Sequence, residues 1–356
     1  MALVAPNIVL SERYAGVLLG TAVGDALGLP AEGLSRGRIR RKWGGLWRHR
    51  FCFGHGMVSD DTEHTLFVAQ ALLTHPDDAA AFQRCLAWKL RLWLLGLPAG
   101  IGLATLKAII RLWLGFPPGR SGVWSAGNGP AMRSAIIGAY YAEDPDKRRE
   151  FVAAATRLTH TDPKAGVAAL AVAEAAAWSM GQKPAAEEWL AHLSQLSNDD
   201  EWQVVCAKMV AALKAGKLVS EFADHLGLNK GVTGYAYHTV PVALYAWMRH
   251  PDDFHLALTS TLDCGGDTDT TGAIAGALMG ASMGREAIPQ QWVEVICDQP
   301  RSVWVLTQVG QSLAEQKITG KIQGSVTYLW PLLAIRNAGF IRLVLLHGCR
   351  RLLPPY

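Results

Sequence analysis

Glycine recurs at every fourth position in two separate stretches of this chain, at residues 16, 20, 24 and 28 and again at residues 272, 276, 280 and 284. Residues four apart lie on one face of an α-helix, so each stretch predicts a helix with one face that carries no side chains. A glycine inside a helix costs about 0.5–1 kcal/mol relative to alanine. A series of four therefore indicates the close approach of two backbones, and we expect the two glycine faces to pack near each other. This packing would bring together the acids that flank them, which are Asp25, Glu32, Asp267 and Asp269.

The rest of the chain shows the period of helices rather than strands. Apolar residues follow helical spacing at 67–75, 167–180 and 201–216, and no run of alternating β-branched residues is bounded by turns. With 356 residues, of which 50% are hydrophobic and 18% charged, the chain can bury a large core. We therefore predict an all-α protein with one domain.

Two other apolar stretches are candidates for membrane helices. In residues 85–116 four cations and a Gly/Pro break at 96–102 interrupt any span of about 20 apolar residues, so we predict two buried helices. The tail at 339–356 is basic and apolar but too short to span. It predicts a final helix packed on the domain, with a helix that contacts a membrane surface or a partner as the less favoured alternative. Asp25 and Arg285, at the ends of the glycine helices, favour a soluble core there as well.

Charge and cysteine usage indicate the class of partner and the compartment. The net charge is +4 and the sequence pI is about 8.7, with Lys and Arg scattered along the chain, which argues against a dedicated nucleic-acid-binding protein. Acidic small molecules remain possible ligands. The six cysteines are far apart and form no C-x-x-C pair, and the N-terminal residues lack the basic region of a signal peptide. Both features predict a cytoplasmic protein.

Two acidic clusters stand directly before predicted helices, SDDT at 59–62 and GGDTDT at 265–270. Each has an ordinary structural explanation. Asp60 can cap a helix, with Glu63 completing a capping box, and Asp267 can cap a helix that begins near Thr270. A cap needs only one oxygen, however, so carboxylate oxygens remain for another purpose.

Metal binding is the second explanation for these clusters. Hard cations such as Mg²⁺, Mn²⁺ and Ca²⁺ take ligand sets made only of oxygens. If both clusters face one cavity, they suit two metal ions about 3.5–4 Å apart. The candidate ligands are Ser59, Asp60, Asp61, Asp267, Asp269 and Thr270. The cap and metal explanations both stay open at this point.

Two further stretches are typical of ligand-binding loops. SAGNGPAMR at 125–133 places Gly127, Asn128 and Gly129 just before a helix, where free N–H groups suit phosphate oxygens. The alternative is an ordinary Asn-Gly turn. LTHTDPKAG at 158–166 places His160 and Asp162 before another helix, and we interpret His160 as a substrate contact at most.

Five motifs in chain order resemble the ADP-ribosylglycohydrolase family. They are GTAVGDALGLPAE (20–32), SDDTEHTL (59–66), SAGNGPAMR (125–133), LTHTDPKAG (158–166) and CGGDTDTTGAIAGALMGA (264–281). The resemblance covers roughly residues 11–310. It implies an orthogonal multi-helix, all-α domain over residues 1–320 with a dimetal site for Mg²⁺ or Mn²⁺, and it leaves a C-terminal tail at 321–356 that we expect to form a packed helix.

The resemblance also implies a role for each candidate residue. The six oxygen donors named above match the metal ligands, and Glu32 and Asp61 match acids near the metals, one of which relays a proton. The remaining positions are implied substrate contacts: Ser125, Gly127, Asn128, Gly129, Met132, His160 and Gly265.

The activity implied by this resemblance is metal-dependent hydrolysis of the glycosidic bond between ADP-ribose and a modified protein side chain, with arginine favoured. The partner would be an ADP-ribosylated protein or a small ADP-ribose conjugate. One alternative is another ribosyl or nucleotide conjugate as substrate, and another is a non-catalytic ADP-ribose-binding or crystallin-like structural protein. Crowded carboxylates repel each other, which weighs against a purely structural role.

Overall fold

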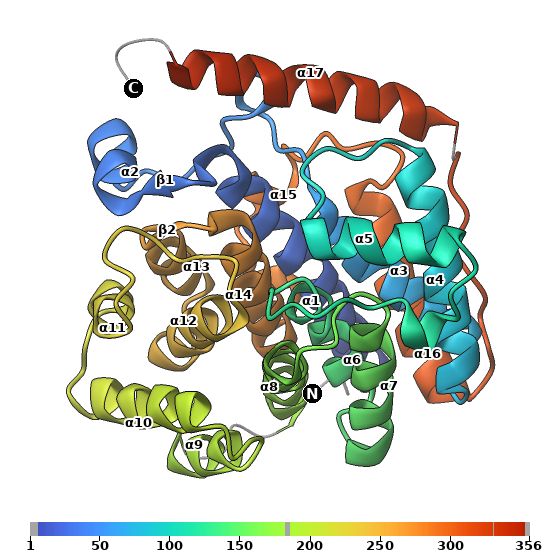
Figure 1. Cartoon of the computed structure of the whole chain (residues 1–356), viewed down its shortest axis with the longest axis horizontal. Coiled ribbons are helices and arrows are strands. Elements are labelled where there is room, and N and C mark those ends of the chain that lie inside the picture. Colours follow the sequence, from blue (N-terminus) through green and yellow to red (C-terminus); the bar gives the residue numbers. More distant parts are fainter. Residues whose placement is uncertain (1–5, 182–185, 330, 353–356) are drawn as a thin grey trace, which may run out of the picture.

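The computed structural model describes residues 6–181, 186–329 and 331–352, which are mostly helical (Figure 1). The longer helices of the N-terminal half are α1 (Pro6–Gly28), α3 (Asp60–Thr74), α4 (Ala79–Leu95), α5 (Leu103–Trp113), α7 (Pro145–Arg157) and α8 (Pro163–Met180). Those of the C-terminal half are α10 (Asp200–Lys214), α12 (Ala236–Arg249), α14 (Thr268–Met283), α16 (Val303–Thr319) and α17 (Leu332–Leu352). Shorter helices are α2 (Arg36–Trp43), α6 (Ala135–Tyr140), α9 (Ala186–Ser194), α11 (Val219–His225), α13 (Phe254–Leu262) and α15 (Gln290–Val293), with 3₁₀ turns η1 (Leu29–Ala31), η2 (Cys52–Gly54), η3 (Pro118–Arg120), η4 (Ala131–Arg133) and η5 (Arg285–Ala287).

The two glycine helices, α1 and α14, lie against each other in opposite directions, as expected. A methyl group placed on Gly20 would lie 2.1 Å from the carbonyl oxygen of Gly276, and one on Gly24 would lie 2.1 Å from that of Gly272. The same contact repeats between Gly16 and Gly280. Because no side chain separates the two backbones, the acidic residues at the ends of these helices reach one region.

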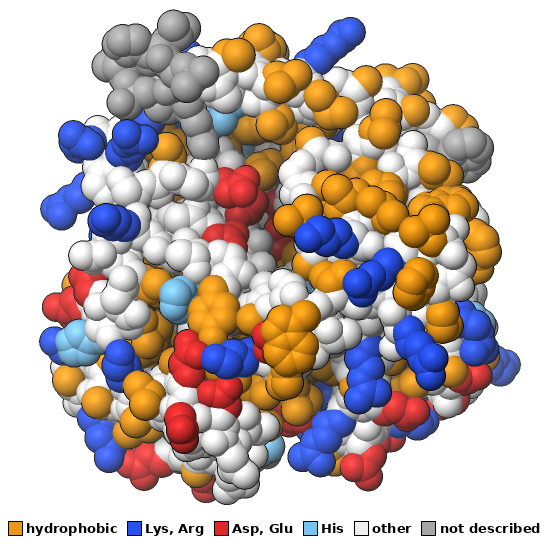
Figure 2. Space-filling model, viewed as in Figure 1, with side chains coloured by type: hydrophobic (Ala, Val, Ile, Leu, Met, Phe, Trp, Pro, Cys, Tyr) orange, Lys and Arg blue, Asp and Glu red, His pale blue; other side chains and the backbone are white. Residues whose placement is uncertain are grey.

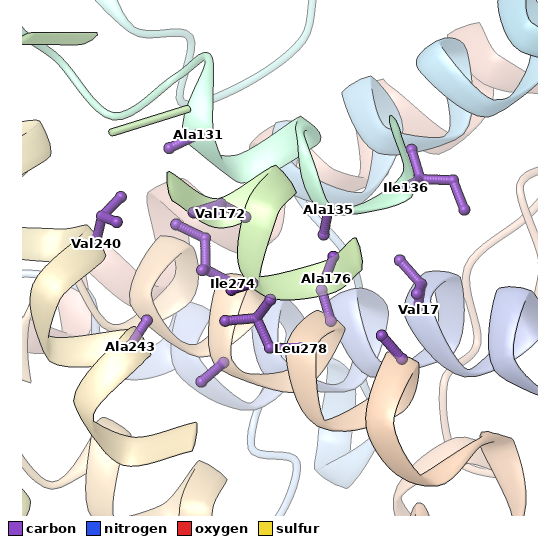
Figure 3. Close-up of a cluster of buried hydrophobic side chains, with 14 of the residues drawn as sticks. Val17, Ala131, Ala135, Ile136, Val172, Ala176, Val240, Ala243, Ile274 and Leu278 are labelled. Carbon is purple, nitrogen blue, oxygen red and sulfur yellow. The ribbon is translucent and has the colours of Figure 1, made fainter. Parts of the chain in front are cut away.

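The core surrounds this helix pair (Figure 3). Val17 of α1, Ala135 of α6, Val172 of α8, Val240 of α12 and Ile274 of α14 are all at most 1% exposed. Three further helices, α6, α8 and α12, therefore pack around the glycine contact, which lies in the core of the molecule.

A short strand pair accompanies the helices. β1 (Leu34–Ser35) pairs antiparallel with β2 (Gly265–Gly266), with Leu34 opposite Gly266. Gly265 and Gly266 have φ of +71° and +82°, a left-handed conformation that glycine adopts at little cost. The all-α prediction thus describes most of the chain, and this pair fixes the turn that leads into α14.

The two helices within residues 85–116 are half-buried rather than buried, which corrects the sequence prediction. α4 buries Leu90 and Trp93, but its Leu92 is 61% exposed and Leu95 is 63% exposed. Their apolar residues cover more of the helix surface than the neighbouring helices α3 and α7 can cover.

The tail forms a helix, α17, which contacts the domain through one side. Phe340 and Asn337 are buried, and the Asn337 side chain donates a hydrogen bond to the Gly96 carbonyl oxygen (2.6 Å). The helix begins at Leu332, so the expectation that it is too short to span a membrane is wrong.

Among the described residues, two helical segments, Leu10–Ala31 and Leu332–Arg350, are long and apolar enough to cross a membrane by length and composition alone. Of the apolar stretch in the first segment 94% is buried inside the protein, and of that in the second 17%. The domain boundary at residue 320 stays a prediction.

The glycine contact makes a first prediction. Gly24→Ala should lower the free energy of unfolding by about 3 kcal/mol or prevent folding, because its methyl group has no space beside a backbone carbonyl. Gly37→Ala is the matched control, since a methyl group there meets no atom within 4 Å, and it should be neutral or stabilise by up to about 1 kcal/mol. Urea denaturation of both variants measures the effects, and equal effects would contradict close packing at Gly24.

A buried ion pair between α7 and α8 makes a second prediction. Burial alone would raise the pKa of Glu174, but hydrogen bonds from His192 (3.0 Å) and Arg148 (2.8 Å) override burial and lower that pKa to about 2. A carboxyl with a depressed folded-state pKa stabilises the fold above its unfolded pKa near 4.5, and this contribution is lost progressively as the pH falls toward 2.

Glu174→Gln should therefore lower the free energy of unfolding by about 3 kcal/mol at neutral pH, and the difference from wild type should shrink below pH 4.5. Thermal or urea unfolding over a pH series measures this difference. Glu187→Gln, at an exposed position of α9, is the control and should change little. A pH-independent deficit in Glu174→Gln would show that the pair contributes through packing alone.

Candidate functional site

The first acidic cluster stands at the start of α3 and is held there by Asp25 of α1. The buried Asp25 Oδ2 accepts hydrogen bonds from the Ser59 N–H (2.8 Å), the Thr62 N–H (3.2 Å) and the Thr62 hydroxyl (2.6 Å). Ser59, not Asp60, occupies the N-cap position, and its Oγ accepts from the Asp61 N–H (3.4 Å). The predicted capping box at Asp60 is therefore wrong, and the carboxylates of Asp60 and Asp61 are not used as caps.

The second cluster stands at the start of α14. Asp267 occupies the N-cap position of a helix that begins at Thr268, but its side chain makes no hydrogen bond to the helix. Its Oδ2 instead accepts from the Asn128 side-chain amide (2.7 Å). The cap explanation is wrong here too, and the contact joins the second cluster to the loop at 125–133.

The two clusters meet across Asp61. The Asp61 Oδ2 accepts hydrogen bonds from the Ser59 hydroxyl (3.2 Å) and from the Thr270 hydroxyl (3.3 Å). The bond from Thr270 connects residues 209 positions apart in the chain. The structure thus brings together members of both predicted ligand sets, as the glycine contact led us to expect.

A cleft of about 510 Å³ opens above this junction, and Figure 2 shows acidic side chains in a hollow near the centre of that face. The predicted site residues that line the cleft are Glu32, Asp60, Ser125, Gly127, Asn128, Gly129, Met132, His160, Asp267, Asp269 and Thr270. Ser59 and Asp61 are buried beneath them, 5% and 1% exposed. Gly265 lies beside the cleft in β2, and its neighbour Gly266 provides the lining instead.

Burial, with repulsion among carboxylates second, disfavours the charged forms of the acids at the cleft floor. Burial, with Asp25 and Asp60 next, raises the pKa of Asp61 well above its ordinary value. Burial also raises the pKa of Asp269, with Glu32, Asp267 and Asp61 as further causes. Burial raises the pKa of Asp25 to about 6. Each carboxyl is thus destabilised in its charged form, and a bound cation would remove that cost.

The carboxylate oxygens also fit a cation by their bonding. Asp61 Oδ1, Asp269 Oδ1 and Asp25 Oδ1 are buried and have no hydrogen-bond partner, although a buried carboxylate oxygen normally has one. The hydroxyls of Ser59 and Thr270 add two further oxygens, and oxygen is the ligand type that hard divalent ions take. No three His, Cys, Asp or Glu side chains of the described residues are grouped as a ready metal site, so the dimetal centre stays a prediction.

His160 lines the cleft as a neutral imidazole. Burial, and then Arg133, lower the pKa of His160 to about 3. Arg133 donates a hydrogen bond to the Thr159 Oγ1 (2.6 Å), and this oxygen lies 2.9 Å from the His160 Nδ1. The His160 Nε2 lies against the 125–133 loop, where a methyl group on Gly127 would be 3.1 Å away.

The loop at 125–133 differs from the sequence expectation in its N–H groups. The Gly127 N–H donates to the Ser125 Oγ (3.3 Å) and the Asn128 N–H donates to the Gly234 carbonyl oxygen (3.0 Å). Two of the three predicted phosphate donors are therefore used within the protein. The loop contributes mainly the Asn128 side chain and open space above its glycines.

Several residues of the site were missed from the sequence. Thr105 of α5 and the segment 232–234 line the cleft, and no local motif identifies them. Below the cleft, Glu63 accepts hydrogen bonds from Trp93 (2.5 Å) and from Arg301. This contact joins α3 to residues 238 positions away, so single-sequence spacing carries no signal for it.

Known proteins match this chain over most of its length. A family model described as ADP-ribosylglycohydrolase matches residues 6–323. An uncharacterized protein of Archaeoglobus fulgidus is 32% identical over 300 residues, which cover 81% of this chain and 93% of that protein. The ADP-ribosyl-[dinitrogen reductase] glycohydrolase of Rhodospirillum rubrum is 29% identical over 295 residues, covering 79% and 89%. A solved structure described as an ADP-ribosylglycohydrolase-related protein complex has a TM-score of 0.63 at 27% identity, over 86% of this chain and 98% of that one.

Proposed function

Because this chain belongs to the ADP-ribosylglycohydrolase family and is a glycohydrolase acting on ADP-ribose conjugates, we propose that it releases ADP-ribose from a modified protein side chain with two divalent metal ions. The resemblance seen in the five motifs is thereby confirmed. The observation that supports metal-dependent release of ADP-ribose from a protein side chain is the cleft itself. Carboxylates of both acidic clusters face one open volume of about 510 Å³, beside polar groups suited to a sugar and its phosphates.

Mg²⁺ or Mn²⁺ would be held by Ser59, Asp60, Asp61, Asp267, Asp269 and Thr270, the oxygen donors that converge at the helix starts. Metal ions there would orient the ribose hydroxyls and supply a nucleophilic water at neutral pH. Arg133, acting through the Thr159 hydroxyl, holds the neutral His160 beside the 125–133 loop, where its Nε2 would contact the nucleotide part of the substrate.

Glu32 and Asp61 have different surroundings, which separates their proposed roles. Asp61 is buried and accepts two hydroxyl hydrogen bonds, an arrangement suited to a fixed ligand. Glu32 lines the open cleft, where water and substrate can reach it. We assign the proton transfer to Glu32, since a general base must lie within hydrogen-bond reach of the proton it accepts. The negative charge of both groups would stabilise the oxocarbenium-like transition state of glycosidic cleavage.

The charge of the cleft favours arginine as the modified side chain. Opposite charges attract most strongly where water is partly excluded, and Glu32, an acid outside the proposed ligand set, lines the cleft. A guanidinium leaving group, which is cationic when protonated, matches this surface better than a serine hydroxyl does. We also propose the cytoplasm as the compartment, because Cys206 and Cys264 are buried free thiols of the kind that reducing compartments keep. The alternatives are a different ribosyl conjugate and a binding role without turnover.

Metal binding makes the first prediction of this proposal. Mn²⁺ at about one hundred times its dissociation constant should stabilise the wild-type protein by about 2.7 kcal/mol. Asp269→Asn should lose most of this stabilisation because it removes a ligand charge. Asp253→Asn is the matched control, since Asp253 caps α13 through its Oδ1 and asparagine caps equally well. Thermal unfolding with Mn²⁺, with Mg²⁺ and with EDTA measures the shift, and equal shifts in both variants would contradict the assigned site.

Catalysis makes the second prediction. ADP-ribose release should be fastest from an arginine-ADP-ribosylated peptide, slower from the serine-linked one, and absent with EDTA. Glu32→Gln should lower kcat by about 10²–10⁴-fold while metal binding is retained. Release that EDTA does not affect would contradict the dimetal proposal. Metal-dependent binding of ADP-ribose without release from any conjugate would instead favour the binding role.

A further inference from the structure

The part of the molecule around α17 and the α4–α5 hairpin exposes many large apolar side chains. Water-facing sides of helices in soluble proteins are normally polar. On α17, however, Ile335 is 72% exposed, Leu345 62% and Leu346 67%. The residues that we call the docking face are Leu92, Leu95, Leu97, Leu114, Ile335, Leu345 and Leu346, each at least 61% exposed. We propose that this face docks the protein on the surface of an anionic lipid bilayer.

The two halves of the docking face are neighbours in space. The Asn337 side chain of α17 hydrogen-bonds to Gly96 at the end of α4, and Phe340 shares a buried cluster with Ala99 of the α4–α5 loop. Figure 2 shows hydrophobic side chains along α17 and over α5, with Lys and Arg among them. The face is therefore one surface rather than two.

The charge of these segments selects an anionic partner. Residues 79–142 and 316–356 contain no Asp or Glu. They contain the cations Arg84, Lys89, Arg91, Lys107, Arg111, Arg120 and Arg133 in the first segment and Lys317, Lys321, Arg336, Arg342, Arg350 and Arg351 in the second. Of these, Lys107 and Arg342 are exposed beside the apolar residues. Exposed apolar residues on two segments that carry cations and no acids match a bilayer with anionic headgroups. A second copy of this chain is a poorer partner, because two such faces would repel each other.

Backbone strain beside α17 supports the same conclusion. Among the described residues, Phe53 (φ +57°) and Leu97 (φ +53°) are the non-glycine residues with positive φ. Both are bulky and apolar, and they are 98% and 70% exposed. Phe51, two residues from Phe53, packs against Phe340 of α17 with ring centroids 5.9 Å apart. Positions that keep a costly backbone conformation are typical of functional sites, which agrees with a docking role for this surface.

The ion pairs of α17 hold the helix flat on the domain rather than across a membrane. Arg336 donates to Asp298 (2.6 Å) and to the Val58 carbonyl oxygen (2.5 Å), and it lies 3.7 Å from Glu63. All of these side chains are buried, so withdrawing α17 into a bilayer would leave Asp298 as a buried, unpaired charge, which is strongly unfavourable. The outer side of α17 can therefore contact lipid while the inner side stays bound. The family match ends at residue 323, before this helix begins.

Vesicle binding by the full chain tests the proposal, and it reads out binding independently of catalysis. Wild-type protein should sediment with vesicles made of phosphatidylglycerol and phosphatidylcholine in equal parts, at least about tenfold more tightly than with phosphatidylcholine alone, and high salt should weaken this binding. Ile335→Glu/Leu345→Glu should abolish sedimentation, and Arg342→Gln should weaken it about fivefold. Val204→Glu, at a 53% exposed apolar position on α10, is the matched control and should bind like wild type.

Circular dichroism and ADP-ribose release in solution should be the same in all four proteins, which separates lost docking from lost folding. No sedimentation of wild type with anionic vesicles overturns the proposal. Equal loss in Val204→Glu and in the double variant also overturns it. A concentration-dependent dimer that Ile335→Glu/Leu345→Glu abolishes, without vesicle binding, would assign the face to a second copy of the chain and overturn it as well.

Discussion

The close contact of α1 with α14 determines the rest of this structure, because it places two helix ends and an acidic turn within one small region. In most helix pairs the side chains keep the axes 8–10 Å apart. Here glycine meets glycine at three successive turns, so Asp25, Asp267 and Asp269 converge on the start of α3. If the axes of α1 and α14 lay further apart, the two acidic clusters would also move apart and would no longer line the bottom of one cleft.

The cleft combines charge repulsion at its floor with strong support below it. The carboxyls of Asp61 and Asp269 are both destabilised as anions by burial and by neighbouring carboxylates, among which Asp267 acts on both. The surrounding helices resist this repulsion through buried ion pairs, in which Glu63 binds Arg301 and Asp298 binds Arg336. Perturbed carboxyls in a cleft are typical of functional sites. The network around Glu63 and Asp298 explains how such a site can persist in a folded chain.

The sequence was sufficient for the features that depend on local spacing. The glycine period predicted the contact between helices 250 residues apart, and the motifs predicted eleven of the residues that line the cleft. Features that depend on pairing between distant residues could not be predicted in this way. Examples are the cap of α3 by Asp25, the bond between Glu63 and Arg301, and the β1–β2 pair. α17 begins at Leu332, seven residues before the predicted tail at 339–356, so the helix is longer than the tail alone indicates.

A glycine–glycine helix contact has a consequence for alignment. Smooth helix faces have no interlocking side chains, and a slip of four residues would leave most of the glycine contacts intact. The correct alignment must therefore be specified at the two ends. At one end the Thr268 hydroxyl donates to the Gly28 carbonyl oxygen (2.8 Å), and at the other Glu12 pairs with Arg285 (2.6 Å). These two contacts fix the register of α1 against α14 at both ends of the glycine contact. Thr268 directly follows Asp267, so one of the contacts that set the register also lies beside the acidic cluster.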